Sequence, residues 1–294
     1  MSLVTVVIPV FNGADLVRSA IASVVGQTGC ELEIIVVDDG STDDTPRVLQ
    51  SLQGISKVIR TPNIGARGIG RNRNLGARAG SGEWIGFLDH DDLWLSGKLE
   101  RQLALASSTR ADVVYTNVLN VGETDRIGGS AYEAKSLPCG DVFEKLLFDN
   151  FLFTSSVLVR REAFESVGGF SEDGEVTEDW DLWLRLAAAG YSFYGAPEIL
   201  TQYLWRHSSV SKNHVEARKL RRATVERALL GARAKSLSGA QIRRVRANTE
   251  ATSAWFLADE HPAHAILWYA NAMRYWPFDS RHLKGLIKSV LRLI

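Results

Sequence analysis

The sequence of 294 residues contains only two cysteines, Cys30 and Cys139, and these offer neither a disulfide framework nor zinc-type spacing. Low cysteine content fits a reducing compartment. Long hydrophobic runs are also absent, since none approaches the roughly 20 residues that a membrane-spanning helix needs. The first residues, MSLVTVVIPVF, lack the basic leader and the cleavage site of a signal peptide, and they predict a strand instead. These absences favour a cytoplasmic protein.

Net charge is lacking as well, because 34 Lys and Arg residues balance 34 Asp and Glu residues. A total of zero gives no support for a nucleic-acid partner. The distribution is uneven, however: residues 1–211 hold 18 basic against 28 acidic residues, whereas residues 212–294 hold 16 against 6. We therefore predict two domains, one over 1–211 and a basic helical C-terminal extension over 212–294.

The first half of the chain alternates β-branched runs with amphipathic stretches. The runs predict strands at 3–10, 31–39, 56–60 and 83–89. The stretches between them predict helices at 14–27, 42–52 and 68–80. This alternation is typical of an α/β fold in which helices sandwich a mainly parallel sheet.

The second half begins with a mixed pattern and ends with helices alone. Strands are expected at 112–121 and 155–161, and helices at 141–149 and 178–190. From 213 onward the pattern is helical, with segments at about 213–236, 239–258, 262–275 and 280–293.

Three of the predicted strands end in polar or aromatic residues. In a parallel sheet, ligands bind beyond the carboxyl ends of the strands. The expected rim consists of Pro9, Val10, Phe11, Asp38, Asp39 and the segment 89–92. Asp38 and Asp39 could accept hydrogen bonds from a base or a ribose, while the residues after them supply a turn and a helix cap.

The segment GFLDHDDLW, residues 86–94, places three carboxylates within four residues at the end of a buried strand. Like charges repel, so the cluster is unfavourable unless a cation binds there. Asp89 and Asp91 suit Mg²⁺ or Mn²⁺, which commonly bind one or two carboxylates together with substrate phosphates. The alternative is a solvated strand end with Asp92 as a helix cap. The buried strand that precedes the cluster favours the metal site.

A glycine-rich segment, NIGARGIGRNRNLGARAG, covers residues 63–80. Its glycines, Gly65 among them, permit close backbone approach, and Arg71 at a helix start could meet a phosphate. The spacing of these glycines is wrong for a dinucleotide-binding fingerprint, which we therefore exclude.

Two later segments also hold candidate residues. TEDWDLWLRL, residues 177–186, begins a helix with Glu178 and Asp179, where acids are common partners of the helix dipole. An acid near a metal–phosphate site can also act as a general base. YLWRHSSVS, residues 203–211, offers Arg206 for a diphosphate and His207 for a metal, although a structural role for the histidine is an open alternative.

Taken in order, these segments resemble the family 2 glycosyltransferases, enzymes of the GT-A fold that use nucleotide sugars. The resemblance covers most of 3–211 and rests on five segments: VTVVIPVFNGADLVRSAIASVVGQT, EIIVVDDGSTDDT, the Gly65–Arg71–Asn72 region, GEWIGFLDHDD and TEDWDLWLRLAAAG. It implies the inverting transfer of a sugar from a nucleoside-diphosphate sugar to a hydroxyl acceptor. The implied acceptor is a glycan or a lipid-linked glycan, and the implied cofactor is Mg²⁺ or Mn²⁺.

The resemblance also implies roles for matching residues. Those for the donor nucleotide sugar are Pro9, Val10, Phe11, Asp39, Gly65, Arg71, Asp89 and Arg206. Asp91 would be the principal metal ligand, with Asp89 and His207 as further ligands. Asp179 would be the general base and Glu178 its neighbour. Leu204 stands where the family often has an arginine, which weakens the roles of Arg206 and His207.

Two other functions stay open. A nucleotidyltransferase would be expected to carry a Gly-rich, basic loop after the first strand, and PVFNGAD does not supply one. The other is a non-catalytic protein that binds a nucleotide sugar or a nucleic acid. The tail contains no recognisable nucleic-acid module, so we do not expect a nucleic acid to bind.

The segment 280–294 predicts a basic amphipathic helix whose apolar face consists of Leu283, Leu286, Ile287, Val290, Leu291 and Ile294. It suits either an anionic membrane surface, with the protein peripheral at the cytoplasmic face, or packing against neighbouring helices. The sequence leaves the oligomeric state open.

Overall fold

The computed structural model describes residues 1–63, 68–122, 129–131, 137–172, 174, 177–205 and 214–293. The chain divides into two compact units. The first comprises Met1–Val142, Phe151–Gly174 and Arg185–His207, and the second comprises Phe143–Asn150, Glu175–Leu184 and Ser208–Ile294. The domain boundary that the sequence predicts, between 211 and 212, lies outside the described residues and stays a prediction.

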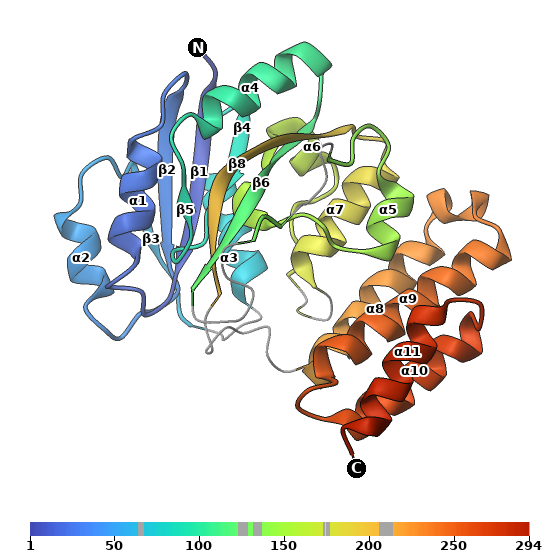
Figure 1. The fold of residues 1–294 in the computed structure, drawn as a ribbon. Coiled ribbons are helices and arrows are strands. Elements are labelled where there is room, and N and C mark those ends of the chain that lie inside the picture. The colour runs from blue at the N-terminus through green and yellow to red at the C-terminus, as the bar shows by residue number, and fades with distance from the viewer. Residues whose placement is uncertain are drawn as a thin grey trace. The chain divides into compact units, whose positions relative to one another are not determined.

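The first unit is built on an eight-stranded sheet (Figure 1). Its strands are β1 (Leu3–Val10), β2 (Glu31–Asp38), β3 (Lys57–Arg60), β4 (Trp84–Phe87), β5 (Leu93–Trp94), β6 (Val113–Gly122), β7 (Leu158–Arg160) and β8 (Phe193–Trp205). They lie in the order β3-β2-β1-β4-β7-β6-β8-β5. Strands β1 to β4 run parallel, as do β6 and β8, whereas β7 and β5 are antiparallel to their neighbours. The predicted α/β class is confirmed, and the parallel part of the sheet brings the ends of β1, β2 and β4 to one edge.

Helices cover both faces of this sheet. They are α1 (Val17–Val25), α2 (Thr45–Ser51), α3 (Gly68–Ala79), α4 (Lys98–Thr109), α6 (Arg161–Ser166) and the last turn of α7 (Glu178–Ala188). Because successive strand residues point to opposite faces, Val6 and Ile8 of β1 share one core cluster with α1 and α4. Val7 points the other way, against Gly76 of α3, where a side chain larger than hydrogen would collide with it.

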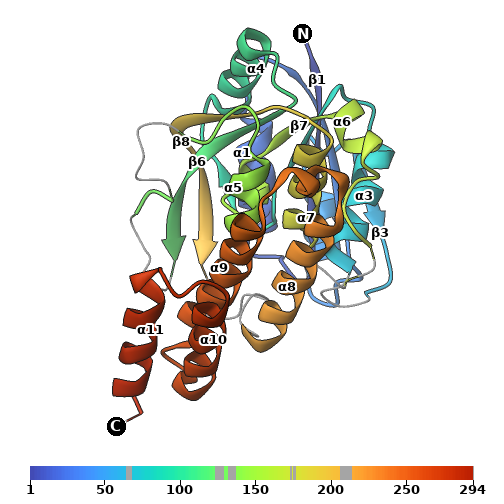
Figure 2. The same cartoon turned by 90° about the vertical axis from the view of Figure 1, so that its right-hand side faces the viewer.

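The second unit is helical. It contains α5 (Phe143–Phe148), the first seven residues of α7, α8 (His214–Leu230), the 3-10 turn Ala232–Ser236, α9 (Gly239–Leu257), α10 (Pro262–Tyr275) and α11 (Ser280–Leu291). Helices α9, α10 and α11 pack on one another (Figure 2). Their core contains Leu257, Trp268 and Tyr269. Ser238 begins α9 with a reciprocal side-chain cap to Gln241. The expected helices of the tail are confirmed, except that the first ends at Leu230 and not at 236.

Within the described residues, none of the helices has both the length and the apolarity that crossing a bilayer requires.

Candidate functional site

The ends of β1 and β2 form the first part of the site. Val10 pairs in register with Asp38, and the backbone N–H of Asp39 donates to the Val10 carbonyl at 2.9 Å. Pro9 and Val10 are buried, whereas Phe11, one residue past the strand, keeps 44% of its surface exposed. Phe11 and Asp39 therefore leave neighbouring strands at the same level of the sheet.

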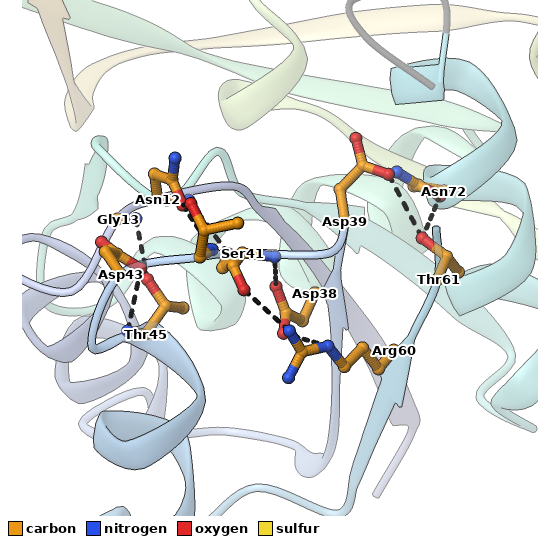
Figure 3. A network of polar contacts seen from close by, with 11 residues as sticks. Asn12, Gly13, Asp38, Asp39, Ser41, Asp43, Thr45, Arg60, Thr61 and Asn72 are labelled. Carbon is orange, nitrogen blue, oxygen red and sulfur yellow. Dashed lines mark hydrogen bonds and ion pairs between the residues drawn. The ribbon is translucent and has the colours of Figure 1, made fainter. Parts of the chain in front are cut away.

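The Asp39 carboxylate is buried at this edge and is held by two side chains. Thr61 Oγ1 donates to Asp39 Oδ1 at 3.2 Å, and Asn63 Nδ2 donates to Oδ2 at 3.3 Å. Figure 3 shows the carboxylate turned toward Thr61 and Asn72. Each carboxylate oxygen can accept more than one hydrogen bond. Asp39 can therefore still accept an N–H or O–H group from a ligand.

Asp38 makes contacts of another kind, which fix the turn between β2 and α2. Its side chain is buried, accepts from the backbone N–H of Ser41 at 2.9 Å, and lies 3.6 Å from the Arg60 guanidinium. Ser41 Oγ in turn accepts from the backbone N–H of Asn12 at 3.0 Å (Figure 3). We therefore assign Asp38 to the support of the turn, and we keep Asp39 as the candidate acceptor for a ligand.

The acidic segment after β4 forms the second part of the site. The Asp89 carboxylate accepts a charged hydrogen bond of 2.7 Å from Arg73 of α3. The Asp89 backbone N–H donates to Ser155 Oγ at 3.1 Å. Asp89 and Asp91 are both half-buried, so the segment is fixed to the first unit but still reaches its surface.

Asp92, the third acid of the segment, is buried. Ser155 Oγ donates to its Oδ2 at 2.5 Å, and the backbone N–H of Leu204 donates to its Oδ1 at 2.9 Å. Burial, and to a smaller extent the charges of Asp89 and Asp91, raises the pKa of the Asp92 carboxyl well above its ordinary value. The alternative of a helix cap is wrong, because the next helix, α4, begins at Lys98 after Gly97. Asp92 instead ties the segment after β4 to the 3-10 turn at 154–156 and to β8.

His90 connects this segment to the loop after β1. Its ring lies against Gly13 so closely that a Cβ at position 13 would overlap His90 Cδ2. The backbone N–H of Gly13 donates to Thr45 Oγ1 at 2.9 Å, which holds the loop on the other side (Figure 3). The two parts of the site are therefore packed against each other through Gly13.

Arg73 is a site residue that the sequence analysis missed in favour of Arg71. Arg73 is buried, lies 5.4 Å over the Phe170 ring and pairs with Asp89, whereas Arg71 has no ion pair among the described residues. Helical spacing gave a usable signal, because Arg73 shares a face with the small residues Gly76 and Ala77 that meet the sheet.

Glu178 and Asp179 begin the helix α7, as predicted, and they belong to the second unit. Asp179 Oδ1 accepts from the backbone N–H of Trp180 at 2.6 Å, and Oδ2 accepts from Asn150 Nδ2 at 3.2 Å. Trp180 is anchored in turn through its indole N–H, which donates to the Leu146 carbonyl of α5 at 2.7 Å. These contacts give the Asp179 carboxylate a defined orientation.

Arg221 of α8 adds a positive charge to this neighbourhood. Burial lowers the pKa of the Arg221 guanidinium, and the charges of Asp149 and Asp179 act in the opposite direction. Burial disfavours the charged form of Asp149 as well, which raises the pKa of its carboxyl, and the charge of Arg221 partly offsets that rise. The helical tail thus supplies an attractive electrostatic partner to Asp179.

Three predicted site residues, Gly65, Arg206 and His207, lie outside the described residues. Their roles stay predictions.

The carboxylates of the site decide whether a divalent cation could bind there. Among the described residues, no group of three or more His, Cys, Asp or Glu side chains gathers as a complete metal site. A site shared with a phosphate ligand needs only one or two carboxylates. Asp89 and Asp91 supply such hard oxygen donors, and their negative charge contributes to the raised pKa of Asp92. The residues therefore fit Mg²⁺ or Mn²⁺ bound together with phosphate.

Comparison with known proteins agrees with this architecture. The family model for glycosyl transferase family 2 matches residues 5–168, which includes the β1–β2 rim and the acidic segment. The chain belongs to glycosyl transferase family 2. It is a glycosyltransferase, and it has the α/β architecture of the GT-A fold with helices added at the C-terminus.

Two relatives illustrate the range of the family 2 similarity. An uncharacterized glycosyltransferase of Rickettsia conorii, RC0461, is 30% identical over 191 residues, which cover 63% of this chain and 31% of that protein. The Escherichia coli glucosyltransferase WfaP, named for transfer from UDP-Glc to GlcNAc-diphosphoundecaprenol, is 28% identical over 213 residues. This alignment covers 72% of the present chain and 81% of WfaP. The chain thus matches less than a third of the length of the first relative and most of the second.

Two solved structures share the fold. Residues 1–349 of S. aureus TarS, in complex with UDP-GlcNAc, superpose with a TM-score of 0.69 at 17% identity, covering 94% of this chain and 81% of that one. A mannosyltransferase of Pyrobaculum calidifontis, in complex with GDP-Man and Mn²⁺, gives a TM-score of 0.62 at 19% identity, covering 98% and 86%. At these identities the comparison supports the fold of this family 2 member.

Proposed function

We propose that this glycosyltransferase moves a sugar from a nucleoside-diphosphate sugar to a hydroxyl acceptor in a metal-assisted, inverting reaction. The observation that carries the proposal is the arrangement at one sheet edge. Phe11 and Asp39 leave adjacent strands there, and the segment with Asp89 and Asp91 packs against the loop that follows Phe11. An aromatic surface, a buried acceptor and a pair of acids are the groups that a nucleoside diphosphate with its cation would need.

In this proposal the first strand ends bind the nucleoside. The exposed Phe11 ring offers a stacking surface for a base. Asp39 accepts a hydrogen bond from a base N–H or a ribose hydroxyl, and its own contacts to Thr61 and Asn63 keep the carboxylate oriented. Pro9 and Val10 act through the strand that positions Phe11.

Asp89 and Asp91 would hold the divalent cation. When bound, such a cation neutralises negative charge that develops on the diphosphate leaving group. Arg73 keeps Asp89 in place through its 2.7 Å hydrogen bond. Ser155 and Leu204 hold Asp92, and that residue fixes the loop without facing the ligand. Arg71, half-buried in the first turn of α3, is the further candidate for a phosphate.

Asp179 would remove the proton of the acceptor hydroxyl as the oxygen attacks the anomeric carbon. The bond from that carbon to the diphosphate breaks in the same step, so a single displacement inverts the configuration. Asn150 and the Trp180 N–H orient the Asp179 carboxylate, and Arg221 attracts its charge. Glu178 is its neighbour in the first turn of α7.

The acceptor in this proposal is a glycan or lipid-linked glycan of cell-surface polysaccharide synthesis. The support comes from relatives, since WfaP is named for action on a diphosphoundecaprenol-linked sugar. The predicted cytoplasmic location stays part of this proposal.

The test is a turnover assay with UDP-glucose, UDP-GlcNAc or GDP-mannose, Mn²⁺ and a lipid-diphosphate GlcNAc acceptor. We expect nucleoside diphosphate to be released and the product linkage to be inverted. Asp179→Asn should lower kcat about 100-fold or more, because it removes the base while keeping the shape of the side chain. The control Asp44→Asn, an exposed acid at the start of α2, should leave kcat unchanged.

Two results would contradict the proposal. Release of pyrophosphate from a nucleoside triphosphate and a sugar phosphate would identify a nucleotidyltransferase. Nucleotide-sugar binding without turnover, unaffected by Asp179→Asn, would identify a binding protein.

A further inference from the structure

Helix α11 is packed on the second unit by small and polar residues and by Leu286. Gly285 lies so close to the Tyr269 ring of α10 that a Cβ there would overlap it. Ser289 is fully buried and donates to the Gly285 carbonyl at 2.9 Å, and His282 is also buried. At about 100° per residue these three positions fall on one side of the helix. This side contacts α10 and makes the helix part of the unit.

Among the apolar residues of α11, Leu286 packs against the core of the second unit, and four others point elsewhere. Leu283, Ile287, Val290 and Leu291 fall together within about a third of the helix circumference. Their exposed fractions are 45%, 49%, 38% and 66%, although aliphatic side chains of a helix normally pack inward. The side chain of Leu293, just past the helix, is 56% exposed. We call this set of residues the α11 apolar face.

A basic strip borders the α11 apolar face. Lys284 and Lys288 lie one turn apart beside it, and neither makes an ion pair with a residue that the structure describes. Arg281 and Arg292 flank them and are paired with Asp279 and Asp259. The segment 280–294 has no acidic residue at all. The helix therefore presents apolar and positive surface side by side, without negative charge of its own.

We propose that the α11 apolar face is a docking surface for an anionic lipid bilayer. The helix would lie in the plane of the interface, with its leucines and isoleucine among the acyl chains and Lys284 and Lys288 at the acidic headgroups. Charge complementarity selects this occupant, because an uncharged protein groove would gain nothing from the two lysines. The inference does not depend on the sugar chemistry proposed above, so either can fail alone.

The experiment is flotation of the full chain with vesicles of phosphatidylcholine alone or with about 30% phosphatidylglycerol. We expect binding to the anionic vesicles and much weaker binding to the neutral ones. Ile287→Ser combined with Leu291→Ser should weaken binding to anionic vesicles about tenfold or more, because apolar burial is lost. Lys284→Gln combined with Lys288→Gln should weaken it about tenfold, and added salt should have little further effect on this variant.

Matched controls separate this surface from general stickiness and from misfolding. Val58→Ser replaces an apolar residue of the first unit that is 46% exposed, close to the exposure of Ile287. Lys57→Gln combined with Lys235→Gln removes two other exposed lysines. Both controls should bind vesicles as the unchanged chain does, and all variants should keep its melting temperature within a few degrees.

The proposal is overturned if the unchanged chain does not bind anionic vesicles, or if the Ile287/Leu291 variant binds them equally well. It is also overturned if the chain is a dimer in sedimentation that the same two substitutions dissociate while no vesicle binding occurs. That result would assign the α11 apolar face to a second copy of the chain.

Discussion

At the scale of residues, the acids of the 89–92 segment have different partners and different burial although they are close in sequence. Asp89 pairs with the buried Arg73, and Asp92 is held by Ser155 and Leu204. Asp91, which is half-buried at the surface of the first unit, is the acid that we propose as the chief ligand of the cation. A buried carboxylate next to two others is unfavourable, and the raised pKa of Asp92 expresses that cost.

The sequence could predict that acids gather here but not which of them is buried. The contacts that hold the buried Asp92 come from Ser155 and Leu204, which lie 63 and 112 positions further along the chain. No local pattern contains that information. Arg73 is a different case, because helical spacing alone places it on the inward face of α3. The glycine-rich pattern drew attention to Arg71 instead.

Lys98 gives a prediction about stability and pH. It is fully buried in α4, donates to Gln102 at 2.7 Å and lies 4.0 Å over the Trp94 ring. Burial lowers its pKa well below the ordinary value of 10.5. At pH values between the lowered pKa and 10.5, Lys98 is protonated in the unfolded chain but neutral in the folded one. The free energy of unfolding therefore rises as pH rises through that window.

Replacing Lys98 by methionine should remove that pH dependence. We expect the stability of Lys98→Met, relative to the unchanged chain, to fall as pH rises from the lowered pKa toward about 10.5. Urea unfolding at several pH values measures it. Lys57→Met, at an exposed position of β3, should show no such trend. A constant difference between Lys98→Met and the unchanged chain would refute this account of Lys98.

At the scale of elements, the site depends on two loops that meet at Gly13 and His90. The first follows β1 and is bound to the β2–α2 turn by Thr45 Oγ1. The second follows β4 and carries Asp89 and Asp91. The positions of β1, β2 and β4 along the chain were predictable to within two residues, because buried parallel strands appear as apolar runs. Strand β5 was not, since its two residues are too few to show a pattern.

Gly13→Ala tests this contact. The added methyl group would overlap the His90 ring and Val10 Cγ2, so we expect a loss of about 1–3 kcal/mol of unfolding free energy. Denaturant titration measures the loss. His90→Ala should recover much of it in the double variant, because the obstructing ring is gone. Gly129→Ala has open space around the new methyl group and serves as the control. If the changes in unfolding free energy caused by Gly13→Ala and His90→Ala simply added in the double variant, the Gly13–His90 contact would make no contribution to stability.

At the scale of the whole molecule, the charge asymmetry of the sequence has a partial structural explanation. Within 212–294 many acids are paired internally, as Glu250 is with Arg218 and Glu226 with Arg246. These pairs hold the helices together, and Arg221 of the same unit faces the acids Asp149 and Asp179. The sequence predicted the helices and their charge. It could not show that α11 turns its aliphatic side outward, because Gly285 and Tyr269 decide that packing across two helices.

The central claim is that a divalent cation and a nucleoside diphosphate bind together at the rim. The most direct measurement is the melting temperature with UDP, GDP or dTDP, each with and without Mn²⁺. One nucleotide should raise the midpoint by about 5 °C or more at saturation, and only with Mn²⁺. Asp91→Asn should abolish the rise, whereas Asp44→Asn should keep it. An equal rise without Mn²⁺, or in Asp91→Asn, would contradict the account.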